Sequence, residues 1–200
     1  MISKKMLLDN TGKDISAKLK KMNYNLITYL ENDNDKSISE LISGNIQEFE
    51  DENIINIKKY LFRACRELTK VNLPNCITIG MGAFRDCTAL SNVNLPECEE
   101  VGTSSFLHCT ALSKIIFQKI KIMEVGAFED CSNLETLIIK NDTRVCIMRK
   151  EGTTDALSGT KIESGNGYIY VPDKLVQQYK TAYGWDEYAN QIKPLSEYTE

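Results

Sequence analysis

The sequence predicts an α/β solenoid built from coils of 22 residues. Three observations support this fold class: apolar residue types recur at a step of 22 over four successive copies, each copy carries the alternating pattern of a short strand, and glycine and proline recur between the strands. Stacked copies place their strands side by side. We therefore expect one parallel β-sheet on a concave face, with short helices or turns on the convex side.

The repeat is first visible in the cysteines. Thiols stand eleven residues apart at Cys65, Cys76, Cys87, Cys98 and Cys109, and the series resumes after Ile120 at Cys131. A continuous helix with this period is excluded because Pro74, Pro96 and several glycines would break it. Doubling the step aligns five apolar rows: Phe62, Phe84, Phe106 and Phe128; Cys65, Cys87, Cys109 and Cys131; Leu68, Leu90, Leu112 and Leu134; Val71, Val93, Ile115 and Leu137; Leu73, Leu95, Phe117 and Ile139.

Each copy begins with a strand. In "LTKVNL" the residues Leu68, Val71 and Leu73 point inward, and Pro74 ends the strand. A turn and a short helical segment such as "GAFRDC" follow before the next strand. The Leu-x-x-Val-x-Leu pattern at this period is the signature of a leucine-rich repeat, so we expect the solenoid to span residues 37–150.

The seven cysteines are expected to be free thiols, because the chain shows no secretory signal. The eleven-residue step places six of them, all except Cys146, at two corners of each coil, where a small and largely apolar side chain fits. The sequence therefore predicts a buried, unreactive ladder. Disulfides or a metal ion between neighbouring thiols are the alternatives, and the surrounding rows of Phe and Leu disfavour both. We expect no metal site and no cofactor.

Three stretches share one pattern that resembles the BspA-like leucine-rich repeats of bacteria: "LTKVNLPNCITIGMGAFRDC", "LSNVNLPECEEVGTSSFLHC" and "LSKIIFQKIKIMEVGAFEDC". The resemblance covers about residues 57–140. It implies a protein that works through its surface, either an adhesin-like bacterial protein or a structural protein of a phage tail or prophage. In the third stretch Gln118 replaces proline, Ile120 replaces cysteine and Glu124 replaces glycine, so we expect a wider corner there.

Residues 151–200 are expected to cap the C-terminal end of the solenoid. Residues 168–171 form a strand in this prediction, and Asp173 caps a helix over residues 174–182. A second short helix is expected around residues 185–192. This tail is similar to the ending of many such proteins in gut bacteria and their phages.

Residues 1–36 are expected to form a helical segment and a polar linker. The helix over residues 11–30 carries an apolar stripe at spacings of four and three, which is typical of a coiled coil: Ile15, Leu19, Met22, Leu26 and Tyr29. Two interpretations remain open. The stripe packs on the solenoid as an N-terminal cap, or it forms a self-association or docking helix that could make the protein a homo-oligomer.

Composition restricts the partners and the location. The net charge of −4 argues against a nucleic-acid-binding protein, which would usually be basic. No apolar stretch approaches the roughly 20 residues of a membrane helix. The N-terminus lacks the apolar core of a signal peptide, so we expect a cytoplasmic or virion-associated protein. A secreted or cell-surface protein is the alternative if the sequence is truncated.

The single histidine, His108, stands beside Cys109, and such a pair can act as base and nucleophile. No third group that would orient the imidazole is evident in the sequence. We therefore expect a surface histidine beside a core thiol and no catalytic residue. An enzyme with a site in the cap region is the alternative.

The concave face is the expected binding surface. Its outward positions are Lys70, Asn92, Lys114 and Thr136 in one row and Asn72, Asn94, Ile116 and Ile138 in the next. The third copy's corner or the C-terminal cap covers Ile116 and Ile138, or these two residues form the apolar centre of a partner site.

The sequence thus favours a non-enzymatic interaction protein that binds a protein partner, or a glycan, through this face. The phage-associated or intracellular version is preferred. A secreted adhesin that binds a host protein or glycan is the alternative.

Overall fold

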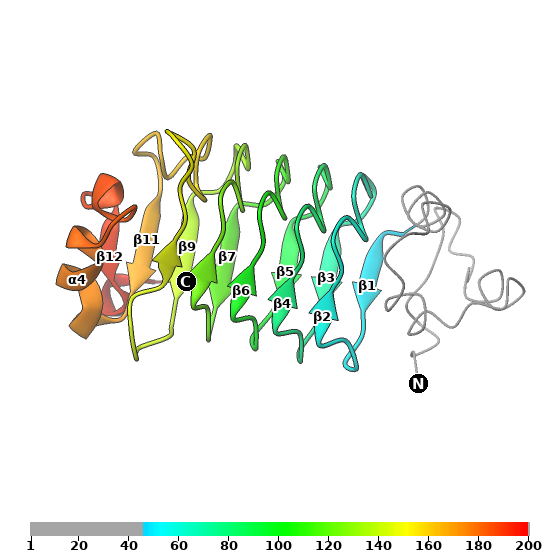
Figure 1. Cartoon of the computed structure of the whole chain (residues 1–200), viewed down its shortest axis with the longest axis horizontal. Coiled ribbons are helices and arrows are strands. Elements are labelled where there is room, and N and C mark those ends of the chain that lie inside the picture. The colour runs from blue at the N-terminus through cyan, green and yellow to red at the C-terminus, as the bar shows by residue number, and fades with distance from the viewer. Residues whose placement is uncertain (1–45, 200) are drawn as a thin grey trace, which may run out of the picture.

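The computed structural model describes residues 46–199, which form a β-solenoid with its strands in a row along the long axis (Figure 1). One side, here called the main sheet, carries two parallel ladders: β1 (Glu48–Glu50), β3 (Lys70–Asn72) and β5 (Asn92–Asn94), and then β7 (Lys114–Phe117), β9 (Thr136–Ile139), β11 (Tyr168–Val171) and β12 (Ile192–Pro194). The second sheet is continuous and consists of β2 (Asn56–Ile57), β4 (Thr78–Ile79), β6 (Glu100–Val101), β8 (Ile122–Met123) and β10 (Ile147–Met148).

The strand register confirms the predicted fold class and its 22-residue step. Val71 pairs with Val93, Ile115 with Leu137, and Ile79 with Val101. Each partner therefore occupies the same position in the next coil. The repeat is a parallel-sheet solenoid, as predicted from the sequence.

Stacked phenylalanines occupy the interior beside the turns. The rings of Phe62, Phe84, Phe106 and Phe128 follow one another at centroid distances of 5.2 Å, with interplanar angles between 1° and 15°. Residues of the five predicted apolar rows are buried, with the exception of the half-buried Val93. Truncating one buried phenylalanine to alanine typically costs about 3–5 kcal/mol, so this row is a main source of stability.

The segments that were expected to be helical are turns. Asp86 and His108 have φ angles of 64° and 62°, in the left-handed region that a right-handed helix cannot contain. Their N–H groups donate to the next coil; the bond from Asp86 to the Leu107 carbonyl oxygen measures 2.8 Å. Because the donors are used between coils, residues 81–86 and 103–108 stack as turns instead of forming helices.

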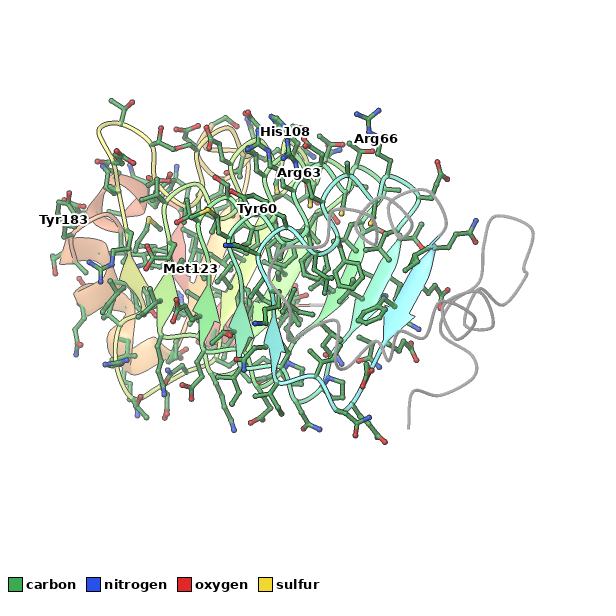
Figure 2. All side chains as sticks on the ribbon, turned by 45° about the vertical axis from the view of Figure 1, so that its right-hand side comes forward. Tyr60, Arg63, Arg66, His108, Met123 and Tyr183 are labelled. Carbon is green, nitrogen blue, oxygen red and sulfur yellow. The ribbon has the colours of Figure 1, made fainter. Side chains whose placement is uncertain are left out.

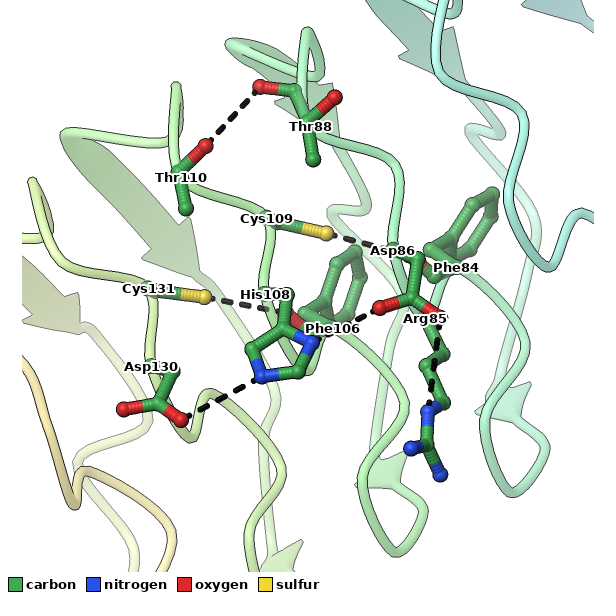
Figure 3. Close-up of polar contacts among 10 residues, drawn as sticks. All are labelled: Phe84, Arg85, Asp86, Thr88, Phe106, His108, Cys109, Thr110, Asp130 and Cys131. Atoms are coloured by element: carbon green, nitrogen blue, oxygen red, sulfur yellow. Dashed lines mark hydrogen bonds and ion pairs between the residues drawn. The ribbon is translucent and has the colours of Figure 1, made fainter.

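Burial of the thiols follows the prediction. All seven cysteines lie in the described residues, are buried and are free. Cys109 Sγ donates to the Phe84 carbonyl oxygen (3.2 Å), and Cys131 Sγ donates to that of Phe106 (3.1 Å) (Figure 3). Burial raises the pKa of Cys76 to about 11 and that of Cys146 to about 12. The thiols are thus hydrogen-bond donors of the core.

The wider corner expected in the third copy is not observed at Glu124. The Glu124 N–H donates to the Val101 carbonyl oxygen (2.9 Å), as the Gly102 N–H donates to that of Ile79 (2.8 Å). The second sheet therefore runs through the third copy without interruption.

The C-terminal cap differs from the prediction in two respects. A helix is present as η1 (Asp173–Leu175) followed by α4 (Val176–Thr181), but Asp173 does not cap it. Asp173 Oδ1 instead accepts a hydrogen bond from the Ser196 N–H (3.0 Å) at the start of η3 (Leu195–Glu197).

The second predicted helix, over residues 185–192, is wrong. Only a short 3₁₀ turn, η2 (Asp186–Tyr188), forms there, and Ile192 belongs to β12, which pairs with Ile169 of β11. Pairing along β11 satisfies the backbone groups of a strand edge that a helix would have left open.

Buried polar contacts attach the cap to the last coil. The Cys146 N–H donates to the Tyr179 hydroxyl (2.9 Å), and Trp185 Nε1 donates to the Cys146 carbonyl oxygen (2.6 Å). The Tyr188 hydroxyl contacts both carboxylate oxygens of buried Asp155, at 2.9 and 2.8 Å. Burial raises the pKa of Asp155, although this hydrogen bond opposes the shift.

Replacing Ala64 by glycine should leave the free energy of unfolding unchanged or raise it by up to about 1 kcal/mol. Ala64 has a φ angle of 60°, and relief of left-handed strain (about 1–2 kcal/mol) exceeds the added entropy of the unfolded chain (about 0.5–1 kcal/mol). The matched control is Ala83→Gly, which removes a fully buried methyl group and should be destabilising. Urea denaturation of both variants measures this, and equal losses would contradict the assignment of strain to Ala64.

In the native protein, none of the seven thiols should react with a thiol reagent under reducing-agent-free conditions. All seven should react after unfolding in guanidinium. The number of reacted thiols, measured from the chromophore that the reagent releases before and after unfolding, tests whether the cysteines are buried. A thiol that titrates rapidly in the native state would disprove its burial.

Asp155→Asn should change how stability depends on pH. The folded chain holds a proton on Asp155 more tightly than the unfolded chain does, so this carboxyl favours the fold below its ordinary pKa of about 4. That contribution is lost as the pH rises through the raised value. The wild-type free energy of unfolding should therefore fall relative to that of Asp155→Asn between pH 4 and neutrality, and parallel curves would refute the prediction.

Candidate functional site

The outward side chains of the main sheet form two rows across the molecule. The strand register places Glu48 before the first predicted row and Tyr168 after it; Glu50 and Tyr170 flank the second row in the same way. All eight predicted binding residues lie on this face. The face changes along the solenoid, from charged and amide side chains at β1–β5 to apolar and aromatic ones at β9–β12.

At the N-terminal end the predicted binding residues pair with neighbouring side chains of the same face. Lys70 Nζ lies 2.5 Å from a Glu50 oxygen and 3.7 Å from a Glu48 oxygen. The hydrogen bond and charge of Glu50 raise the pKa of Lys70. The Asn94 amide donates to Asn72 Oδ1 across neighbouring strands (2.7 Å). Lys70 is therefore a neutralised cation.

At the C-terminal end the predicted apolar patch is partly covered. Ile138 is completely buried, and Ile116 is half-buried. Tyr198 explains the difference, because its ring lies 5.0 Å from that of Tyr170 and its hydroxyl lies 3.3 Å from Lys114 Nζ. It thus spans the β9 position between these strands. The prediction of Ile138 as an accessible binding residue is wrong, and the alternative that the C-terminal segment covers it holds.

The main sheet is interrupted between β5 and β7. No ladder joins these strands, although the 22-residue step would pair Asn92 with Lys114. The same two coils remain together elsewhere: β6 pairs with β8, and the rings of Phe84 and Phe106 stack at the usual 5.2 Å. Figure 1 shows the wider step between β5 and β7. Separation is therefore local to the main sheet.

A groove of about 470 Å³ lies at this interruption. It is lined by Ser91, Asn92, Val93, Asn94, Pro96, Ser113, Lys114, Ile116 and Gln118. Four of the eight predicted residues are in this list, whereas Lys70, Asn72, Thr136 and Ile138 are not. The partial exposure of Val93, whose counterpart Val71 is fully buried, is a direct consequence of the opening.

Sequence reasoning missed the other lining residues. Ser91 and Ser113 occupy the same repeat position just before each strand, and this recurrence could have identified them. Gln118 was noted only as a departure from the repeat. Tyr168 and Tyr170 follow from extending the outward rows into the predicted strand over residues 168–171.

Among residues 46–199, those that line the groove include one cation and no carboxylate. Lys114 has no carboxylate oxygen within 4.0 Å among the described residues, in contrast to Lys70 and to Lys193, which lies 3.9 Å from Glu197. Three side-chain amides, Asn92, Asn94 and Gln118, supply further donors and acceptors. The arrangement is suited to polar recognition with a positive centre.

The expectation that no third group orients His108 is wrong. Its Nδ1 lies 2.8 Å from Asp86 Oδ1 and its Nε2 lies 3.4 Å from Asp130 Oδ2, in the coils on either side (Figure 3). Cys109 points away, because its thiol donates to the Phe84 carbonyl oxygen in the core. Burial holds the pKa of the Cys109 thiol well above its ordinary value. The histidine therefore links coils and does not activate the thiol.

Other exposed groups lie away from the groove. Figure 2 shows Arg63, Arg66 and His108 along the turn edge of the solenoid and Tyr183 at its C-terminal end. Arg63 stacks over the Tyr60 ring at 5.9 Å. The predicted oligomerisation stripe, Ile15 to Tyr29, lies outside the described residues and stays a prediction.

Within residues 46–199, no group of three or more histidine, cysteine or acidic side chains is arranged to hold a metal ion. Over the same residues, the helices are too short or too polar to cross a membrane.

Comparison with known families agrees with this architecture. Residues 42–149 match the model of the BspA type leucine-rich repeat region, with six copies. The chain belongs to the BspA-type leucine-rich repeat family. The resemblance of the three repeat stretches is thereby confirmed, and BspA-type repeats account for about half of the chain. A search of curated proteins gave no match.

Two solved structures of repeat proteins show the same fold. A leucine-rich repeat protein from Bacteroides ovatus is 21% identical with a TM-score of 0.52, covering 75% of this chain and 36% of that one. The T. pallidum leucine-rich repeat protein is 20% identical with a TM-score of 0.51, covering 63% of this chain and 58% of that one. A leucine-rich cell surface protein from Faecalibacterium prausnitzii is 29% identical with a TM-score of 0.46, covering 48% of this chain and 27% of that one. This BspA-type chain thus spans less than two thirds of each.

Proposed function

We propose that this chain is a non-enzymatic recognition protein that binds a protein partner through the groove of the main sheet. The observation that carries the proposal is the interruption between β5 and β7, which opens the groove among four residues of the predicted binding face. Leucine-rich repeat proteins use such sheet faces for interaction.

The chemistry of the groove supports binding over catalysis. Its lining contains serines, amides, one lysine and apolar side chains, and it contains none of the histidine, cysteine or carboxylate side chains that usually supply a general base. The buried thiols are directed into the core. A surface location and a role in a phage particle stay predictions from the sequence, as does self-association through residues 15–29.

Filling the groove tests the proposal. Asn92→Trp places a large side chain at an exposed lining position, and Ile147→Trp is the matched control, an exposed strand position on the second sheet. A yeast-displayed library of random short peptides is selected on the wild-type chain. Enriched peptides should bind Asn92→Trp at least about tenfold more weakly, a loss of about 1.4 kcal/mol, and Ile147→Trp equally well.

Circular dichroism and thermal melting first establish that both variants fold like the wild-type chain. Peptides that bind the wild type and Asn92→Trp equally would place the recognition surface elsewhere and overturn the proposal. A selection that enriches no peptide would do the same.

A further inference from the structure

We infer that the groove binds an extended peptide segment that carries an acidic side chain, with the peptide backbone bonded to the open strand edges and its carboxylate on Lys114. This inference rests on the proposed function and specifies the class of partner. It depends on three observations: the open edges, the uncompensated charge and the apolar floor.

The open edges follow from the direction of the existing ladders. In a parallel pair, the residues that bond to one neighbour alternate with those that face the other neighbour. Asn92 and Asn94 bond toward β3, as the bond from the Leu73 N–H to the Asn94 carbonyl oxygen shows (3.0 Å). The backbone N–H and C=O of Val93 therefore face β7.

The facing strand is open in the same way. Ser113, Ile115 and Phe117 bond toward β9; the Thr136 N–H donates to the Ser113 carbonyl oxygen (3.1 Å). The backbone groups of Lys114 and Ile116 therefore face β5, and no ladder joins them to it. Both margins of the groove present free donors and acceptors in strand geometry.

Free strand edges recognise extended polypeptide backbone. Peptides that add to a sheet edge gain affinity from main-chain hydrogen bonds and specificity from alternate side chains. A glycan lacks the regular alternation of N–H and C=O that these edges match. In the part of the chain that the structure describes, the lining of the groove includes no aromatic ring for sugar stacking; the exposed Tyr168 lies beyond β9.

Charge complementarity selects an acidic side chain. Lys114 is the groove's cation, and no carboxylate oxygen of the described residues lies within 4.0 Å of it. The Tyr198 hydroxyl, 3.3 Å from Lys114 Nζ, holds the ammonium group on this face. A hydrogen bond between an ammonium group and a carboxylate pairs two opposite charges and is stronger than one to a neutral amide oxygen, so a carboxylate gains more here than an amide.

The apolar floor of the groove favours peptides that carry an apolar residue near the acidic one. Val93 and Ile116 are half-buried and line the groove. An extended peptide directs every second side chain to one face, so a residue two positions from the acidic one can contact Ile116, which shares the outward face with Lys114, while the residue between them faces Val93. A volume of about 470 Å³ is in the lower part of the range of ligand sites, which suits a short segment.

Peptide selection on charge variants tests the inference. The random short-peptide library is selected on the wild-type chain and on Lys114→Gln and Lys114→Arg. The matched control is Lys161→Gln, which removes a cation that pairs with Glu135 (2.9 Å) and does not line the groove. Wild type, Lys114→Arg and Lys161→Gln should enrich peptides with excess Asp and Glu. Lys114→Gln should bind those peptides about tenfold more weakly.

Two synthetic versions of an enriched peptide separate the contributions. Replacing its acidic residue by the corresponding amide should weaken binding to the wild type about tenfold and leave binding to Lys114→Gln unchanged. Methylating alternate backbone nitrogens should abolish binding, because strand addition requires the N–H groups.

The outcomes also separate this inference from the proposed function. Peptides that lose binding to Asn92→Trp but show no acidic excess, or that tolerate backbone methylation, keep the function and overturn the inference. If selection on the wild-type chain enriches no peptide, or if the groove binds an arrayed oligosaccharide instead, both the proposed function and this inference are overturned.

Discussion

Backbone hydrogen bonds between one coil and the next are the constraint on which the structure depends. They fix the coils at a strand-to-strand distance, and within the repeats each strand residue then lies on its counterpart 22 residues away. The same contact therefore recurs from coil to coil: phenylalanine rings stack at 5.2 Å, and thiols donate to carbonyl groups of the preceding coil. The side-chain amides of Asn72 and Asn94 are hydrogen-bonded to each other in the same way. The same spacing forces the turns into left-handed backbone positions at Asp86 and His108, because their N–H groups are used between coils.

The main sheet relaxes this constraint in one place. Between β5 and β7 the coils are joined through the second sheet and the phenylalanine row, and they part only at the surface. The opening exposes backbone that the rest of the main sheet keeps paired, next to Lys114, which no acidic side chain of the described residues neutralises. A regular repeat surface has little to distinguish one position from another. The interruption supplies that distinction, and binding is assigned to it for this reason.

The sequence was sufficient to predict the solenoid, the burial of the thiols and the two outward rows, since these follow from a period that is visible in five residue columns. Three features were not predictable from that period. The turns of residues 81–86 resemble helices locally, and only the bonds to the next coil decide otherwise. Ile138 is buried between Lys114 and Tyr170, and both of these contact Tyr198, which comes from a distant part of the chain. The gap between β5 and β7 is a tertiary feature of two strands whose sequences each fit the repeat. Four predicted binding residues line it; of the others, Lys70 pairs with Glu50, Asn72 accepts a hydrogen bond from Asn94, and Ile138 is buried.

The interruption also has a mechanical consequence. A stack in which each coil contacts only its neighbours behaves as a chain of links, and its strength under tension is that of the weakest link. The step from β5 to β7 lacks the backbone hydrogen bonds that join every other pair of neighbouring strands in the main sheet. A force along the solenoid axis would therefore separate the coils first at this step. A peptide bonded to both margins would act as a splint across this step. Peptide binding in the groove would then make the whole solenoid stiffer, including coils that do not contact the peptide.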